Sequence, residues 1–265
     1  MTDRVAHVPG APALEVERLS AGFGPEPAVR DISFRMKRGE RVAVVGPNGA
    51  GKTTLFHAMA GLLAPQAGHV RIGGSAPGRH RCIAYVPQRT AVDWNFPVTV
   101  GEAVRLGCAG GFGWERGSRP EIRAWVAECL SAVGLAGVER RPIAELSGGQ
   151  QQRLFIARAR AQRAELMLLD EPAGGLDAPS QQDLIRMVND LAARGVAVLM
   201  ATHDFEAAAR ADRVMLLNGR LLADGPPAAV LTEERLDAAF RGASSWRGVG
   251  RTCGLQDPEG TEGAP

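Results

Sequence analysis

The sequence predicts an α/β fold in which helices cover a mainly parallel β-sheet. Short apolar segments alternate along the chain with segments of helical spacing, which is the pattern of strands joined by helices. Several apolar segments are continuous, as in strands that are buried on both faces. One of them, 41–45, runs directly into a glycine-rich loop and then a helix. At 265 residues the chain suits one domain with a subdomain better than two full domains.

The first third of the chain predicts an N-terminal antiparallel β subdomain, followed by the start of the parallel sheet. Two strand patterns separated by a glycine-rich turn come first, and the strand that enters the glycine-rich loop follows them. The expected elements are strands at 14–19, 32–36, 41–45, 69–72 and 83–86, a turn at 22–24 and a helix at 52–60.

The middle third predicts a helical subdomain. Between residues 98 and 134 helical spacing replaces the strand patterns. We expect helices at 100–106 and 121–133, separated by the glycine-rich segment 107–117. The inserted subdomain would span about 90–160.

The last third returns to alternating helices and strands. Helices are expected at 150–161, 180–193 and 205–211, and strands at 166–169, 196–201 and 213–217. The domain would therefore span residues 14–241, with flexible tails at 1–13 and 242–265.

Composition excludes two classes of protein. The net charge of +2 is too small to predict a nucleic-acid partner. No segment approaches the roughly 20 apolar residues of a membrane-spanning helix, and residues 1–12 lack the apolar core of a signal peptide. We therefore expect a cytoplasmic protein that reaches a membrane only through a partner.

The four cysteines predict no metal site or disulfide framework. Cys82, Cys108, Cys129 and Cys253 show no paired spacing, so reduced thiols are expected. His80 lies close to Cys82 and the two could bind a metal together. A histidine in a turn and a cysteine at the start of a buried strand is the favoured interpretation.

A loop of the form G-x-x-x-x-G-K-[ST] lies between the strand at 41–45 and the next helix. Its glycines let backbone N–H groups point at phosphate oxygens, and the helix N-terminus adds partial positive charge. Lys52 is expected to bridge the β- and γ-phosphates of a nucleotide, and the Thr53 hydroxyl to bind Mg²⁺. The predicted nucleotide-binding residues of this loop are Gly46, Pro47, Asn48, Gly49, Ala50, Gly51, Lys52, Thr53 and Thr54.

Two carboxylates follow the apolar strand at 166–169. Asp170 is expected at the sheet edge where open α/β folds bind ligands, and there it would hold Mg²⁺ through a water. Glu171 is expected to orient and deprotonate the attacking water. An Asp-Glu pair alone is commonly just the start of a solvated loop. After a phosphate loop, and at the end of such a strand, the catalytic interpretation is favoured.

The segment Leu146–Gln150 predicts a second anion site. Ser147 suits a helix N-cap, and Gly148 and Gly149 expose N–H groups at the start of a long helix, before Gln150. Alone, these residues would predict only a capped helix. Together with the phosphate loop and the Asp-Glu pair, they closely resemble the signature motif of ABC (ATP-binding cassette) transporter ATPases, which have a P-loop NTPase fold.

The resemblance covers residues 14–241 and implies roles for four further residues. Gln88 matches the glutamine that senses Mg²⁺ and the γ-phosphate and that links to the membrane subunit. His203 matches the switch histidine at the γ-phosphate, and Asp177 matches the D-loop aspartate. Phe23 replaces the tyrosine that stacks on adenine in most relatives, and its ring still offers a π-face.

The resemblance also implies an ATP hydrolase that uses ATP and Mg²⁺ and works as a dimer. In this family two subunits pack head to tail, so that one chain's phosphate loop and the other chain's signature enclose each ATP. Ser147 and Gly149 would then face the partner's γ-phosphate. The implied catalytic residues are Glu171, His203 and Gln88, and the implied Mg²⁺ ligands are Thr53, Gln88 and Asp170.

Within this family the sequence favours a separate transporter subunit. It has one cassette, an insertion of modest length between Gln88 and Leu146, and no fused membrane domain. The resemblance implies permease partners that dock near Gln88, a location on the cytoplasmic face of the membrane, and an extracytoplasmic metal-binding protein in the full system. A soluble ABC ATPase without a membrane role is the alternative from a different class.

The segment Gln88–Val100 informs on the cargo. It resembles the segment that begins at the Q-loop glutamine, here Gln88, in the ATPases of manganese, zinc and iron importers, and it is nearest to the manganese and zinc type. Manganese import is the first expectation and zinc the second, with an iron chelate or another small solute as the alternative. Trp94 and Phe96 could both project as anchors for a membrane subunit, or both pack into the helical subdomain.

Overall fold

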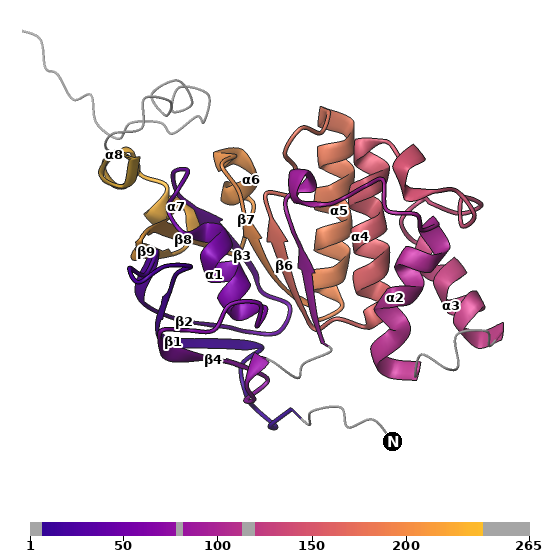
Figure 1. The fold of residues 1–265 in the computed structure, drawn as a ribbon. Helices are drawn as coiled ribbons and strands as arrows, with labels where there is room; N and C mark the ends of the chain where they lie inside the picture. The colour runs from indigo at the N-terminus through magenta and orange to yellow at the C-terminus, as the bar shows by residue number, and fades with distance from the viewer. Residues whose placement is uncertain (1–6, 78–81, 113–119, 241–265) are drawn as a thin grey trace, which may run out of the picture.

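The computed structural model describes residues 7–77, 82–112 and 120–240. It confirms the predicted α/β architecture, with one mainly parallel sheet and one antiparallel sheet (Figure 1). The larger sheet has the order β5–β6–β7–β3–β8–β9 and comprises β3 (Arg41–Val45), β5 (Ile83–Val86), β6 (Leu166–Asp170), β7 (Ala197–Ala201), β8 (Arg213–Asn218) and β9 (Arg220–Gly225). All neighbours in it are parallel except β8 and β9.

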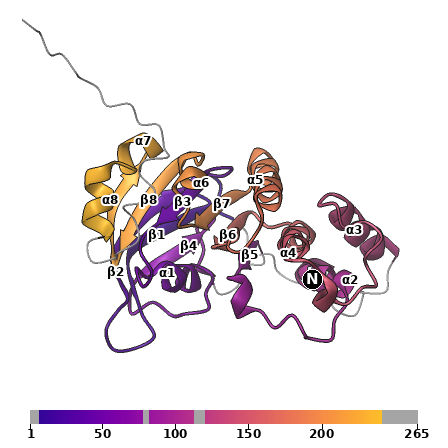
Figure 2. The same ribbon diagram turned by 90° about the horizontal axis from the view of Figure 1, so that it is seen from above.

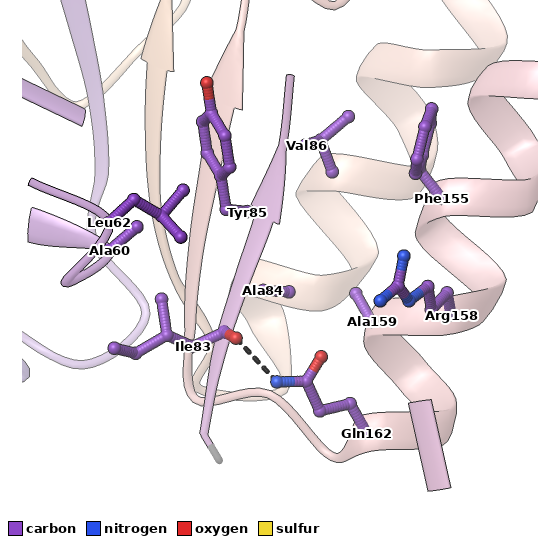
Figure 3. A pocket seen from close by; sticks show the side chains of 10 residues that line it. All are labelled: Ala60, Leu62, Ile83, Ala84, Tyr85, Val86, Phe155, Arg158, Ala159 and Gln162. Atoms are coloured by element: carbon purple, nitrogen blue, oxygen red, sulfur yellow. Dashed lines mark hydrogen bonds between the residues drawn. The ribbon is translucent and has the colours of Figure 1, made fainter. Parts of the chain in front are cut away.

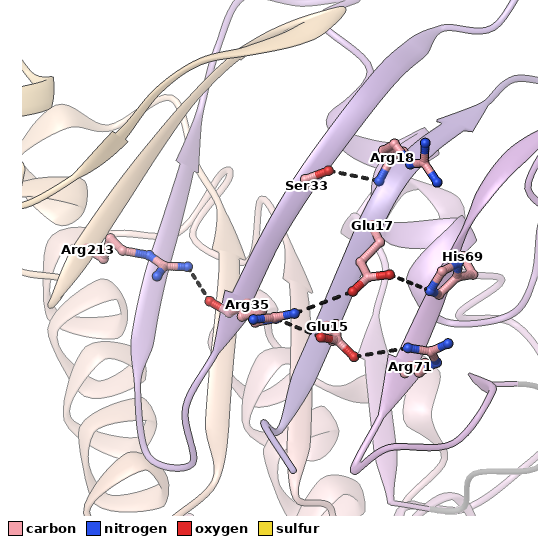
Figure 4. A network of polar contacts seen from close by, with 8 residues as sticks. All are labelled: Glu15, Glu17, Arg18, Ser33, Arg35, His69, Arg71 and Arg213. Carbon is pink, nitrogen blue, oxygen red and sulfur yellow. Dashed lines mark hydrogen bonds and ion pairs between the residues drawn. The ribbon is translucent and has the colours of Figure 1, made fainter.

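The antiparallel sheet has the order β2–β1–β4, from β1 (Leu14–Ala21), β2 (Val29–Met36) and β4 (Ala67–Ile72). Charged side chains line these strands (Figure 4). Glu15 lies 2.6 Å from Arg35 on β2, and Glu17 lies 2.7 Å from His69 on β4. Arg213 on β8 donates to the Arg35 carbonyl at 2.6 Å. The hydrogen bond from Arg213 therefore joins the small sheet to the large one.

The helices are α1 (Lys52–Met59), α2 (Val100–Phe112), α3 (Pro120–Ser131), α4 (Gly148–Gln162), α5 (Ala178–Ala193), α6 (Phe205–Ala209), α7 (Pro227–Val230) and α8 (Glu233–Phe240). Helix α1 packs between the two sheets in one apolar core. Helices α2 to α5 form a second core on the other face of the large sheet, and α6 to α8 form a third against β3 and β8. Figure 2 shows α2 and α3 as a lobe to the side of the sheet, beyond α4.

The central strands are apolar throughout because both of their faces are covered. On β6, Leu166 and Leu168 pack into the core that contains α1, while Met167 and Leu169 pack toward α4 and α5. Side chains alternate between the faces of a strand, so a strand between two layers needs apolar residues at every position. Asp170 is the first polar residue of β6 and lies at its carboxyl end.

The prediction that the glycine-rich segment 107–117 separates two helices is wrong for residues 107–112, because α2 continues through Gly107 to Phe112. A Cβ atom on Gly107 would lie 2.5 Å from the Arg158 carbonyl oxygen of α4. This glycine therefore permits close helix packing and does not end the helix. The remaining segment 113–119 lies outside the described residues.

Three elements after residue 218 were not predicted: β9, α7 and α8. The Asn218–Gly219 pair between β8 and β9 is a hairpin signal, and Gly219 has a φ of 67°. Within the predicted N-terminal tail, Val8 N donates to Gly73 O at 2.9 Å and Ala13 N to Met36 O at 2.9 Å. The C-terminal tail, Cys253 and His80 lie outside the described residues. No helix in the described part of the chain is both long and apolar enough to span a membrane.

Candidate functional site

The phosphate loop connects β3 to α1 and accepts only glycine at two positions. A Cβ atom on Gly46 would lie 2.1 Å from the Leu217 carbonyl oxygen. Gly51 has a φ of 91°, and its Cβ atom would lie 2.4 Å from Val29 Cγ1. The first turn of α1 contains no acidic residue of its own, which suits an anion at this helix N-terminus.

The Lys52 side chain is 6% exposed and folds back into the loop. Its Nζ donates to Gly46 O at 2.8 Å and to Pro47 O at 3.1 Å, and it lies 3.8 Å from Glu171 Oε1. Burial lowers the pKa of Lys52, while the nearby carboxylates of Glu171 and Asp170 oppose that shift. The ammonium group is thus held by two carbonyl oxygens at the place where phosphate charge would replace them.

Asp170 is fully buried at the end of β6 and meets Thr53 across the sheet edge. The Thr53 hydroxyl donates to Asp170 Oδ2 at 2.7 Å, and burial raises the pKa of Asp170. Asp170 Oδ1 has no hydrogen-bond partner within the described part of the chain. The unpartnered Asp170 oxygen and the Thr53 hydroxyl beside it offer only oxygen ligands, and Mg²⁺ prefers oxygen ligands.

Glu171 lies between Lys52 and His203. It has a φ of 49°, a left-handed conformation that is unfavourable for a residue with a side chain, and its N–H donates to Ala201 O at 3.1 Å. Its Oε2 lies 3.9 Å from Nδ1 of His203, whose side chain is 68% exposed. The structure thus brings a carboxylate, a lysine and an accessible histidine to one point.

Phe23 is 74% exposed, in the segment between β1 and β2. Its ring meets His57 edge-on, with 5.9 Å between centroids, and His57 Nε2 lies 3.1 Å from the Tyr85 hydroxyl. The open face of Phe23 fits the expected adenine platform. The sequence did not identify the supporting pair, His57 and Tyr85, because no local pattern links residues 28 positions apart.

The signature residues form a complete capping box at the start of α4. The Ser147 hydroxyl accepts from Gln150 N at 3.3 Å, and Gln150 Oε1 accepts from Ser147 N at 3.0 Å. Because the hydroxyl oxygen accepts in this box, its hydrogen remains available to donate to an anion. Cβ atoms on Gly148 and Gly149 would lie 2.8 Å from Arg89 Nη1 and 2.6 Å from Ser180 Oγ.

Two of the remaining predicted residues each precede a helical segment. Asp177 caps α5 by accepting from Ser180 N at 2.9 Å. Hydrogen bonds from the Ser180 hydroxyl and then from its N–H lower the pKa of Asp177. Gln88 comes two residues after β5 and precedes a short 3-10 turn. The phosphate loop packs with α1 on one face of the large sheet, whereas the signature begins α4 on the other face. The two predicted anion sites of one chain are therefore separate.

A groove of about 260 Å³ lies between β5 and α4 (Figure 3). Leu62, Tyr85 and Phe155 are among its lining residues, and Gln162 Nε2 donates to Ile83 O at 2.5 Å at one end. Arg158 is the cationic residue of this lining, and burial lowers its pKa. The sequence did not single out Arg158.

The two aromatic residues after Gln88 differ in their surroundings. Trp94 Nε1 donates to Arg89 O at 3.1 Å, and the Trp94 ring packs against Phe155 with 5.6 Å between centroids. Phe96 is 58% exposed. Only Phe96 is therefore available as an exposed anchor, while Trp94 belongs to the chain's own packing.

Comparisons with known proteins show the family of the chain. Residues 29–174 match the family described as "ABC transporter". The zinc transport system ATP-binding protein TroB of Treponema pallidum is 42% identical over 88% of each chain. The manganese transport system ATP-binding protein MntB of Halalkalibacterium halodurans is 38% identical, over 87% of this chain and 93% of that protein. Among solved structures, a metal-chelate type ABC transporter in an inward-facing conformation gives a TM-score of 0.77 at 28% identity, over 87% of this chain and 90% of its own.

Proposed function

Because the chain belongs to the ABC transporter family, we propose that it is the ATP-hydrolysing subunit that powers import of a divalent metal ion, manganese first and zinc second. The observation that supports this most directly is its similarity to zinc and manganese transport ATPases over nearly the whole length of the chain. As an ABC ATPase it binds ATP and works with membrane permease subunits.

In the proposed mechanism the phosphate loop binds the nucleotide before any chemistry occurs. The backbone N–H groups at the start of α1 receive the phosphates, and Lys52 exchanges its two carbonyl partners for phosphate oxygens. Phe23 stacks on the adenine, and His57 supports its ring. Glu171 then takes the proton of the attacking water, while His203 faces the γ-phosphate.

We assign Thr53, Asp170 and Gln88 to Mg²⁺. Bound there, the ion would neutralise phosphate charge during transfer. The unpartnered Oδ1 of Asp170 and its hydrogen-bonded Thr53 hydroxyl support the assignment, and Gln88 follows the strand that pairs with β6. Asp170 would hold the ion through a water, because Mg²⁺ gives up its waters reluctantly and usually keeps several of them.

The second anion site completes a head-to-tail dimer in this proposal. Ser147 and Gly149 would donate to the γ-phosphate held by the phosphate loop of the partner. The separation of the two sites on opposite faces of the sheet supports the arrangement, because one chain does not enclose one nucleotide with both. Closure would then require ATP, and hydrolysis would reopen the dimer.

The groove beside β5 is the proposed docking site for a permease subunit on the cytoplasmic face of the membrane. Its apolar lining suits a helix end, and Arg158 suits an acidic side chain on that helix. Phe96, exposed after the same strand, supplies a further apolar contact.

We expect Arg158→Glu to abolish copurification with the permease, because two carboxylates would then face each other in a partly desolvated groove. Loss of the ion pair and the new repulsion together predict a dissociation constant at least about tenfold higher. Binding of the purified variant to the permease in detergent checks this. Arg123→Glu, an exposed arginine on α3 outside the groove, is the matched control. Equal loss in both variants, or in neither, would place docking elsewhere.

The cargo is tested by metal uptake in cells that lack this gene and are complemented with wild type or Glu171→Gln. We expect manganese accumulation to fall on deletion and to return only with the wild type. Zinc and iron as competitors rank the ions, and deletion of an extracytoplasmic metal-binding protein of the same system should lower uptake equally. Unchanged uptake of all three metals would refute metal import and leave the ATPase assignment in place.

A further inference from the structure

Four polar side chains from separate segments meet at the edge of the large sheet opposite the phosphate loop. Cys82 directly precedes β5 and Glu165 directly precedes β6. Arg38 comes from the turn between β2 and β3, and His7 from the segment that precedes β1. The amino ends of parallel strands lie at this edge, so the cluster is separate from the nucleotide site at the carboxyl ends.

The His7 ring lies between a thiol and a carboxylate. Its Nε2 is 3.4 Å from Cys82 Sγ, and its Nδ1 is 3.2 Å from Glu165 Oε2. This is the order of nucleophile, base and orienting acid that activates a cysteine. With both ring nitrogens protonated, Nε2–H donates to the thiolate and Nδ1–H donates to the carboxylate.

Neighbouring residues also hold the ring and the carboxylate. A Cβ atom on Gly73 would lie 2.5 Å from the His7 ring, so the glycine leaves the space that the ring occupies. Val8 N donates to Gly73 O at 2.9 Å and ties the same segment down. Arg38 forms an ion pair with Glu165, and its Nη2 lies 3.0 Å from His7 Nδ1. Because a guanidinium only donates, the imidazolium form requires Arg38 to direct its N–H groups at Glu165 alone.

The geometry favours an activated thiol over a metal ligand. The two ring nitrogens face different partners, so thiol, imidazole and carboxylate do not converge on one point. The described residues include no group of three or more His, Cys, Asp or Glu side chains that could hold a metal ion. Two other cysteines give the opposite case. Burial raises the pKa of Cys108, and it raises that of Cys129 to about 11.

We propose that Cys82 is a reactive thiol, ionised by His7 and Glu165, and that hydroperoxides oxidise it. The thiolate sulfur attacks one peroxide oxygen, the O–O bond breaks, and the imidazolium gives its proton to the departing oxygen. The products are a cysteine sulfenic acid and water or an alcohol, so sulfur loses two electrons and the peroxide gains them. The side chains of His7 and Cys82 are partly exposed, which lets a small peroxide reach the sulfur.

The test is alkylation of the full chain by iodoacetamide between about pH 6 and pH 10, with each cysteine followed by peptide mass spectrometry. An ordinary thiol is only about 1% ionised at pH 6.5. A thiolate of lower basicity is also a weaker nucleophile, so the gain in rate is smaller than the gain in ionisation. We expect His7→Gln to slow the alkylation of Cys82 about fivefold at pH 6.5 and little at pH 10. His69→Gln, which removes a histidine paired with Glu17 on the other sheet, should leave the Cys82 rate unchanged.

Glu165→Gln provides a second variant, with the same expected direction as His7→Gln. Brief treatment with hydrogen peroxide, followed by a carbon nucleophile that traps sulfenic acid, should label Cys82 and leave Cys108 and Cys129 unlabelled. Equal Cys82 rates at pH 6.5 in wild type, His7→Gln and Glu165→Gln would overturn the activation. Rapid alkylation of Cys82 without trapped sulfenic acid would overturn its role in oxidation.

Discussion

Glu171→Gln should bind ATP as tightly as the wild type and hydrolyse it about 10² to 10⁴ times more slowly. The amide has nearly the shape of the carboxylate but cannot accept the proton of the attacking water. The phosphate contacts come from Lys52 and the loop, so affinity is expected to persist. With hydrolysis blocked, the proposed dimer should accumulate in its closed form. Steady-state ATPase assays and size-exclusion chromatography with ATP measure the two effects.

Glu206→Gln is the matched control, because Glu206 is an exposed glutamate on α6 that pairs with Arg210. Omission of Mg²⁺ from the wild-type assay should abolish hydrolysis if the assignment of Thr53 and Asp170 is right. Wild-type turnover in Glu171→Gln would exclude Glu171 as the base. Slow turnover without an ATP-dependent dimer would retain that role and contradict the head-to-tail arrangement.

Lys52→Ala should raise the dissociation constant for ATP about 10- to 100-fold. A charged hydrogen bond is worth about 1.5–3 kcal/mol, and each 1.4 kcal/mol changes affinity tenfold. Lys52 is buried and points into the loop, where phosphate oxygens would replace its two carbonyl partners. Equilibrium binding of a fluorescent ATP analogue measures the change.

The chain has only one other lysine, Lys37, which makes a convenient control. Lys37 is exposed in the turn after β2, where its backbone N–H contacts Glu40. Lys37→Ala should therefore bind ATP like the wild type. Unchanged affinity in Lys52→Ala would refute the assignment of the loop to phosphate.

The parallel strands could be predicted because their burial is written in local sequence. Val42 to Val45 and Leu166 to Leu169 are apolar at every position, and both of their faces are covered. The β9 strand was missed because its residues alternate between exposed and partly buried at the edge of the sheet. Edge strands lack the continuous apolar run that marks a central strand.

The role of Gly107 could not be predicted from local sequence. Gly107 has the same local signal as a loop glycine, and only its contact with the Arg158 carbonyl explains its place within a helix. Likewise Trp94 and Phe96 are two residues apart, yet only Trp94 finds a partner ring on α4. Such distinctions depend on which surface arrives from another part of the chain.

Side chains brought together by the fold were also beyond prediction. His7 and Cys82 are 75 positions apart, so no local pattern links them. By contrast, the phosphate loop and its glycines could be predicted, because each contact there serves a motif of fixed spacing. The role of each of these residues in the reaction stays a prediction until the variants are measured.

Helix α4 has a mechanical consequence. Its 15 residues begin beside Ser147, which would meet the partner's nucleotide, and Arg158 lies in its second half, in the proposed permease groove. At a rise of about 1.5 Å per residue, about 16 Å separates the two positions along a stiff rod. Because α4 packs against α2, α3 and α5 in one core, a tilt at one end would displace the other end together with that core. The displacement that ATP binding would transmit toward the membrane subunit would then depend on how closely α2 packs against α4 at Gly107.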